Sequence, residues 1–409
     1  MKKIIILAVL FCSTLFSEQY LFIFDARMSP ICGAEILYTV HKGLTDAEDH
    51  FTKDLSHSCC PWLYSTGRLG EMLLIWGPLN LTMSAIEHEV FGHGYRIRDI
   101  GRDLVKVSHY SFDPPFPYGS SGATTAYSNT QTLTSFEEMA IAVAGTEANA
   151  IFGRRIKMHW LQNRQVEPKT SSLYVWSAQD LTIYSLLTRN KLNMSHDIQC
   201  YKYWLSLTYG RFLSAKTIKR AALVNLTDTT TYNALWAWWY YVFTGKSASM
   251  WLIPMGSYGY LPSARMSLAP YGPEFYWDNY LVKDDSPIYF YARFGSWAYN
   301  RYCGAGLEWP RVFGKNGFDI GLRLDAYWQP KMLFKSSPYL DEDEDVYYGY
   351  SKKDLSKHIP GLLCALIIEK KWGNLPALYV QAGWKSNGFI PGESLKKAPI
   401  LKLGFSARF

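Results

Sequence analysis

The sequence has few charged residues and lacks the motifs that define several large enzyme classes. Only 19% of its 409 residues are Asp, Glu, Lys or Arg, and the net charge of +7 is spread along the chain. It contains no Gly-rich phosphate loop and no G-x-S-x-G motif. It also has no basic cluster interleaved with aromatic residues, as nucleic-acid-binding chains often have. These absences argue against a nucleotide ligand, a nucleic-acid partner and serine-hydrolase chemistry.

Cysteine is scarce and does not form a metal-binding pattern. There are seven cysteines, and no two of them have C-x-x-C spacing, which argues against a cysteine zinc site. Cys12 lies in a segment that we expect to be removed. Its removal would leave six cysteines, and an even number of cysteines in an exported chain permits disulfides. Their irregular spacing does not predict which cysteines pair. The six remaining cysteines are Cys32, Cys59, Cys60, Cys200, Cys303 and Cys364.

The N-terminus predicts export. The chain begins MKKIIILAVLFCSTLFS, in which two lysines precede an apolar run and small residues. This order is typical of a secretory signal peptide, which we place at 1–17, with cleavage near Ser17. An uncleaved anchor is the alternative, although the apolar run is short for a membrane span.

The C-terminal third alternates between apolar and polar residues. In the last ten residues, ILKLGFSARF, Leu401, Leu403 and Phe405 fall on one face of a strand, and Lys402 falls on the other. Ending on the aromatic Phe409, this strand resembles the closing strand of bacterial outer-membrane β-barrels. Aromatic residues make up 16% of the chain, and Tyr and Trp collect at membrane interfaces. A soluble β-sandwich, which also alternates, is the alternative.

Further segments have the same period, and turn residues separate them. With about seven strands in 250–409 and two more at 19–28 and 34–43, we expect an antiparallel barrel of about 8–10 strands, within the usual range. The additional C-terminal strand candidates are 288–299, 302–309, 318–328 and 377–386, while 362–372 could be a strand or a short helix.

The middle of the chain lacks the two-residue period and reads as helical. Pro78 should start a new helix or kink one, and the Pro/Gly/Ser-rich stretch 111–122 should be a loop. The fold class is therefore α+β. We divide the mature chain into an N-terminal segment (18–66), a helical domain (67–249) and barrel strands (250–409). The expected helices are 67–97, 134–162, 172–189, 196–210 and 230–244.

The stretch EHEVFGHGYR (87–96) contains the candidate site. His88 and His93 are five positions apart, so a regular helix would turn them about 140° from each other. A single π-type turn absorbs one extra residue and returns both rings to one face, and such turns favour functional sites. Gly92 and Gly94 flank His93 and would let the backbone deviate or end the helix.

The motif H-E-x-x-G-H is similar to that of the dipeptidyl peptidase III family of zinc peptidases. His88, Glu89, Gly92 and His93 match it position by position, over six residues of the chain. The resemblance implies that His88 and His93 bind zinc and that Glu89 is the general base. The remainder of the chain does not resemble that family.

A catalytic zinc needs a third protein ligand, and we expect it on the helix at 134–162. Glu147 is the first choice, because its neighbours are almost all apolar and a buried carboxylate needs a cation partner. Glu138 is the second choice, although Thr134 and Ser135 precede it in a pattern that also reads as a capping box.

The sequence thus predicts an outer-membrane zinc peptidase, with membrane lipid and a peptide or protein substrate as its partners. One alternative is a non-enzymatic outer-membrane barrel, a pore or surface protein, with a structural His/Glu cluster. Another is an inner-membrane protease. The apolar H-E helix and the stretch 144–149 (AGTEAN) faintly resemble the intramembrane zinc families, but the Asp-bearing ligand segment is missing.

Overall fold

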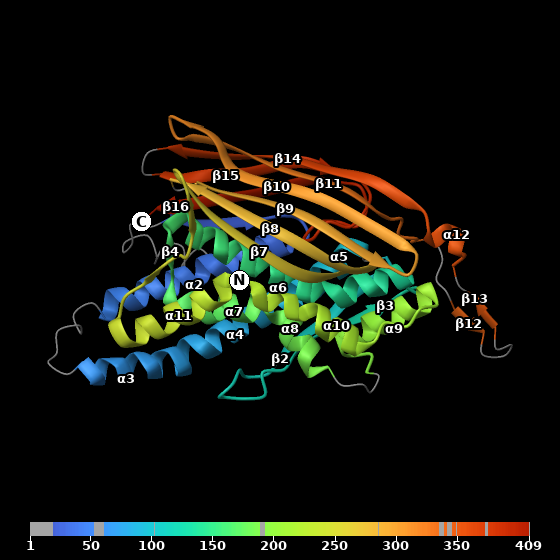
Figure 1. Cartoon of the computed structure of the whole chain (residues 1–409), viewed down its shortest axis with the longest axis horizontal. Helices are drawn as coiled ribbons and strands as arrows, with labels where there is room; N and C mark the ends of the chain where they lie inside the picture. Colours follow the sequence, from blue (N-terminus) through green and yellow to red (C-terminus); the bar gives the residue numbers. More distant parts are fainter. Residues whose placement is uncertain are drawn as a thin grey trace.

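The structure is a computed structural model of the chain, shown in Figure 1. The predicted signal peptide, Cys59, Cys60 and the terminal Phe409 lie outside the described residues, and the four described cysteines are free. The structure describes residues 19–52, 61–101, 103–188, 193–284, 286–334, 339–341, 346–348, 350–372 and 375–408.

One large antiparallel sheet of ten strands forms the upper layer in Figure 1. The strand candidates at 288–299, 302–309, 318–328 and 377–386 are confirmed, and 362–372 lies in a strand. Residues 250–409 contribute nine strands to the sheet, more than the seven or so predicted from the sequence. The first and last strands of the chain, β1 and β16, are neighbours. In order across the sheet the strands are β1 (Gln19–Phe24), β16 (Ala398–Arg408), β15 (Leu375–Lys385), β14 (His358–Trp372), β11 (Phe318–Pro330), β10 (Asn300–Lys315), β9 (Ser286–Trp297), β8 (Gly272–Lys283), β7 (Tyr258–Ala269) and β6 (Ile253–Met255).

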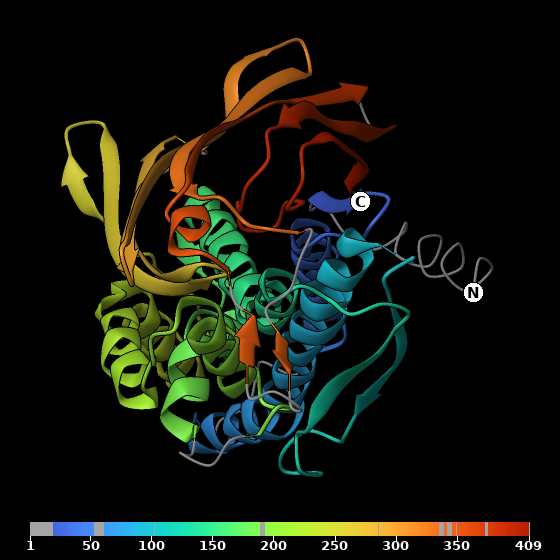
Figure 2. The same cartoon turned by 90° about the vertical axis from the view of Figure 1, so that its right-hand side faces the viewer.

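The sheet is open. Its two edges are β1 and β6, and no pairing between them is found in the described part of the chain, so the structure does not show the closed barrel that we predicted. Figure 2 shows the sheet as an arc that curves around helices on its concave side.

The two faces of the sheet have the opposite polarity to those of a soluble protein. On β16, Leu401 is 58% exposed and Leu403 50%, whereas the intervening Lys402 is 2% exposed. The alternation predicted from the sequence is therefore present, with its apolar face outward. The same pattern continues across the sheet, where large apolar residues face outward from four other strands: Trp277, Phe294, Trp328, Leu362 and Leu366.

The concave side is filled by helices. The central one is α6 (Ser135–Asn163), which begins with a capping box between Thr134 and Glu137. The other helices are α2 (Pro30–Thr52), α7 (Ser171–Ala178), α8 (Asp180–Leu187), α9 (Asp197–Tyr209), α10 (Ala215–Ala222), α11 (Thr229–Thr244) and the short α12 (Lys352–Leu355).

The prediction of a strand at 34–43 is wrong, because this segment belongs to α2. Pro30 begins the helix, a position at which its fixed φ is favourable. The buried residues Ile31, Ala34, Leu37 and Tyr38 recur at intervals of three and four, which is a helical period. Over ten residues that pattern can be mistaken for alternation.

A second set of helical segments runs without a break from α3 to α5. The order is α3 (Pro61–Glu71), the π-turn η2 (Met72–Trp76), α4 (Gly77–Ile86), the π-turn η3 (Glu87–His93) and α5 (Gly94–Ile100). Pro78 lies in the first turn of α4, immediately after η2, which agrees with the predicted irregularity there. Residues Trp62–Ile100 are long and apolar enough to cross a membrane by length and composition.

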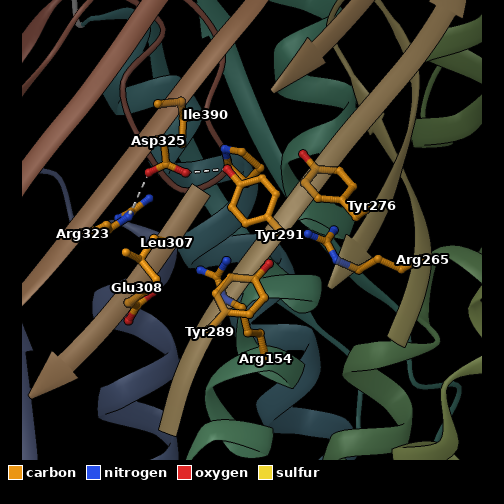
Figure 3. Close-up of a pocket in the computed structure, with 11 residues that line it drawn as sticks. Arg154, Arg265, Tyr276, Tyr289, Tyr291, Leu307, Glu308, Arg323, Asp325 and Ile390 are labelled. Carbon is orange, nitrogen blue, oxygen red and sulfur yellow. Dashed lines mark hydrogen bonds and ion pairs between the residues drawn. The ribbon is translucent and has the colours of Figure 1, made fainter. Parts of the chain in front are cut away.

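The inner face of the sheet meets α6 through buried charges. Arg155 of α6 donates to Glu308 of β10 at 2.6 Å and lies 3.4 Å from Glu35 of α2. Figure 3 shows a neighbouring group in which the guanidinium of Arg154 lies under the ring of Tyr289. The cavity between them has a volume of only about 10 Å³, room for about one water molecule. Charged side chains are thus buried between the sheet and the helices, beside the apolar clusters of the interior.

Candidate metal centre

The predicted π-type turn is present and brings the two histidines together. In η3 the rings of His88 and His93 lie with their centroids 5.0 Å apart. One ligand atom from each of His88, Glu89 and His93 can be chosen so that all lie within 4.8 Å of one another. This upper limit is wider than the separation of about 3.3 Å that two nitrogens bound to one tetrahedral zinc would have. The extra residue of the motif is therefore accommodated by the backbone.

A carboxylate that we did not predict lies between the two rings. Asp197 Oδ2 is 3.0 Å from Nε2 of His88 and 3.1 Å from Nε2 of His93. Asp197 is the first residue of α9. Both Nε2 atoms therefore converge on a single oxygen that comes from a distant part of the chain.

The other nitrogen of each ring is held from behind. His88 Nδ1 lies 3.1 Å from Oδ2 of Asp180, the first residue of α8, and His93 Nδ1 lies 2.7 Å from the carbonyl oxygen of Ile141 on α6. Metal-binding histidines almost always donate their second N–H to such a carboxylate or carbonyl. Each ring is therefore oriented with Nε2 toward the shared oxygen.

This arrangement requires positive charge between the rings and Asp197. Both nitrogens of each histidine face an oxygen acceptor. A neutral imidazole has only one N–H, so these four contacts can all be hydrogen bonds only if both rings are protonated. One divalent cation in place of the two Nε2 protons satisfies the same acceptors with the same total charge.

The ionisation of Asp197 is consistent with that requirement. Burial by itself raises the pKa of its carboxyl group, but the charge on His93 and hydrogen bonds from both rings bring that pKa well below its usual value. Asp197 is therefore a carboxylate at neutral pH, the form in which it can bind a metal.

Glu89 lies on the same turn and is held by a hairpin. Thr125 Oγ1 donates to Glu89 Oε2 at 2.6 Å and also lies 3.0 Å from the Glu89 carbonyl oxygen. Thr125 belongs to β3 (Ala123–Asn129), which pairs with β2 (Val105–Phe112). Residues 113–122 of the predicted loop 111–122 join these two strands, and residues 111 and 112 belong to β2. The hairpin thus fixes the orientation of the predicted general base.

Two glycines allow the centre to form against α6. A Cβ on Gly145 would overlap the His88 imidazole, and one on Gly92 would lie 2.6 Å from the Ala144 carbonyl oxygen. A Cβ on Gly94 would likewise overlap the hydroxyl group of Tyr110. Of the two outcomes predicted for Gly92 and Gly94, a local deviation of the backbone is present, because Gly92 lies in the π-turn η3, whereas the helix does not end there and continues to Ile100.

The structure does not bring Glu147, our first choice of third ligand, to the histidines. Arg96 Nη2 donates to both of its carboxylate oxygens, at 2.9 and 3.1 Å, and the amide of Gly392 donates to Oε1 at 2.6 Å. A buried carboxylate does need a partner, as we argued, but the cation here is the arginine three residues after His93.

Glu138, the second choice, is not joined to either histidine by any contact within the described residues. Its Oε2 accepts a hydrogen bond from Tyr127 at 3.2 Å. The capping role that we considered for it belongs to the preceding Glu137. Sequence reasoning missed Asp197 and Asp180 because an Asp that opens a helix looks like an ordinary favourable first-turn residue. The predicted start of a helix at 196 was the available signal.

Comparisons with known proteins give no further guide to the site, since no family model, curated protein or solved structure matches the chain. The assignment of the centre therefore rests on its geometry.

We expect Gly145→Ala to weaken zinc binding by about 10–100-fold, the usual effect of disturbing the groups that orient a ligand. The added methyl group would displace the His88 ring from Asp180 and Asp197. Titration of the purified protein with zinc measures the change. Gly153→Ala, on the same helix, is the control, because its Cβ would meet its nearest neighbour at 3.2 Å. Equal zinc affinities in the two folded variants would contradict the packing argument.

Proposed function

We propose that the protein is a membrane-associated, zinc-dependent peptidase. The observation that carries the proposal is the convergence of Nε2 of His88 and Nε2 of His93 on one oxygen of Asp197. Two imidazoles and one carboxylate form a donor set that zinc takes in catalytic sites, with the fourth position left open. This donor set replaces the one predicted from the sequence, in which Glu147 was the third ligand.

The residues of the chain have distinct roles in this proposal. A bound zinc ion supplies a Lewis acid that lowers the pKa of a water molecule to about 7. His88, His93 and Asp197 would hold the ion, while Asp180 and the Ile141 carbonyl orient the rings. Glu89 accepts the proton from the attacking water and delivers it to the leaving amine, and Thr125 holds its carboxylate in place.

The outward apolar face of the sheet supports membrane association. Seven adjacent strands, β16 to β8 across the sheet, contain 11 to 16 residues each. A transmembrane β-strand needs about 9–11. Lipid-facing apolar residues that alternate with polar interior residues are typical of outer-membrane barrels. The bacterial outer membrane, reached through the predicted signal peptide, is the location we propose.

The alternative of an open pore is less well supported. Helix α6 packs on the concave side of the sheet, with Ile151, Phe152 and Ile156 in the same buried cluster as Leu261 and Tyr280 of the sheet. The described interior is therefore filled. A non-enzymatic surface protein with a structural cluster remains the competing function.

The test of function is the metal content and peptidase activity of the purified mature protein. We expect about one zinc per chain, cleavage within a library of quenched fluorescent peptides, loss of cleavage on chelation and recovery on addition of zinc. A protein that folds, binds no divalent metal and cleaves no peptide in the library would contradict the proposal and favour the surface protein.

We expect Glu89→Gln to keep the zinc but lose about 100-fold or more in peptidase activity, because it removes the base and no proposed ligand. Metal analysis and cleavage rates on the same preparation measure the two effects. Glu138→Gln is the matched control and should retain both. Full activity in the Glu89→Gln variant would exclude Glu89 as the base.

A further inference from the structure

Beyond the edges of the sheet, three helical segments also expose large apolar side chains on the outside of the molecule. They are α2, the π-turn η2 and α11, together called the helical wall here. In Figure 1, α3, which leads into η2, lies on the side of the molecule opposite the sheet. The large outward residues of the wall are Val40 and Leu44 on α2, Leu73, Leu74 and Ile75 on η2, and Leu235, Trp236, Trp239 and Phe243 on α11, all more than 40% exposed.

The wall is continuous with the sheet on both sides. At one edge, Trp251, Ile253 and Met255 in and before β6 are exposed, and Trp251 is tied to α11 by a hydrogen bond from its amide to Asn233. At the other edge, the exposed Phe24 ends β1 shortly before α2. Within the wall, Met72 and Trp76 of η2 pack on Val242 of α11.

Most charged groups of the wall point inward, and the exception lies near the C-terminal end of α2, where the Asp49 side chain is 69% exposed. Residues 72–86 and the whole of α11 contain no Asp, Glu, Lys or Arg. Glu71, next to η2, accepts a hydrogen bond from the buried Trp76 Nε1 at 2.9 Å. On α2, Glu35 pairs with His159 at 3.1 Å and His41 with Asn80 at 2.7 Å, all on the inner side. The helical wall therefore repeats the inverted polarity of the sheet.

We infer that the helical wall lies against the hydrocarbon of the bilayer and completes the lipid-facing perimeter that the open sheet leaves unfinished. The inference rests on the membrane association proposed above. One protein partner would cover one side of the molecule, whereas these apolar surfaces lie on opposite sides of it. A bilayer covers both. Scattered exposed apolar residues are normal in soluble proteins, but contiguous bands of large exposed apolar residues on both sides of the molecule are not.

This placement also bears on the substrate. His88 follows Ile75 by thirteen residues on the same continuous helix, a rise of about 20 Å. Half of the hydrocarbon thickness is about 15 Å. With η2 near the centre of the bilayer and its helix along the normal, the metal centre lies outside the hydrocarbon. Its substrate is then a polypeptide in water at the membrane surface, not a membrane-spanning segment.

Spin-label accessibility in lipid vesicles tests the placement. Single-cysteine variants Leu74→Cys and Trp239→Cys are made with the other cysteines replaced by serine, and Leu235→Cys serves if Trp239→Cys fails to fold. The native Cys364, exposed on the outer face of β14, is the sheet reference, and Lys216→Cys on α10 is the aqueous reference. Collision rates with oxygen, which enriches in lipid, and with a water-soluble nickel complex are measured at each position.

We expect the labels at 74 and 239 to match Cys364, with an oxygen-to-nickel ratio several-fold above that of Lys216→Cys. High nickel collision at 74 and 239 with Cys364 in lipid would overturn the inference and leave the membrane association intact. Protection of 74 and 239 from both reagents would overturn it in favour of a covering protein. High nickel collision at Cys364 as well would overturn both the inference and the membrane association. Peptide cleavage by the same variants is a separate measurement of the proposed activity.

Discussion

Replacing Asp197 with Asn is expected to empty the metal centre. The substitution leaves the shape of the side chain almost unchanged but removes the negative charge shared by His88 and His93. A neutral amide is a much weaker ligand for zinc than a carboxylate, so we expect affinity to fall by more than the factor of about 10–100 typical of outer-shell changes. Zinc content after dialysis and zinc affinity by titration measure the effect.

Two controls make this result specific. Asp180→Asn alters the partner of His88 Nδ1 and should weaken zinc only by about 10–100-fold. Glu138→Gln changes a carboxylate that touches neither ring and should leave zinc affinity unchanged. If Glu138→Gln empties the centre while Asp197→Asn leaves it occupied, the assignment of the third ligand is wrong.

Replacing Glu147 with Ala should strongly lower the free energy of unfolding. The substitution removes the carboxylate that accepts both hydrogen bonds of Arg96 Nη2, and it leaves this fully buried guanidinium with only Asp99, at 3.4 Å, and the Glu393 carbonyl oxygen. Removing one partner of a buried pair typically costs about 3–5 kcal/mol in the free energy of unfolding. Denaturant unfolding in detergent micelles measures the loss, and the fraction that remains folded should still contain zinc.

The double variant Arg96→Met with Glu147→Leu provides the control for this second prediction. Replacing both charges with apolar side chains removes the unpaired ion, so much of the lost stability should return. The opposite pattern, in which Glu147→Ala remains as stable as the parent protein but contains no zinc, would restore Glu147 as a ligand.

The strands were predictable because their pattern is local. Period-two alternation on β9, β11, β15 and β16 marks each strand without knowledge of its neighbours, and it correctly separates Leu401 and Leu403 from Lys402. The state of the edges was not predictable, since closure depends on whether β1 and β6 meet across the whole molecule. The error at α2 arose where a helical period was judged over too few residues.

The centre was predictable only where its residues are close in sequence. The spacing of His88 and His93 predicted either a π-turn or the absence of a shared metal site, and the structure contains the π-turn. The third contact comes from Asp197, more than 100 residues away, through the packing of α9 beside α6 and η3. Burial correctly indicated that Glu147 needs a cation, but it could not distinguish a metal from the arginine on α5.

The pairing of β1 with β16 has a consequence for how the protein folds. The six register pairs join residues 19–24 to residues 403–408, so the first strand has no partner until almost the whole chain has been made. Such a long sequence separation raises the contact order and slows folding. Until then, the outward apolar faces of the strands and the edge of β16 stay open to aggregation. We therefore expect efficient assembly to depend on factors that keep the chain soluble until β1 pairs with β16.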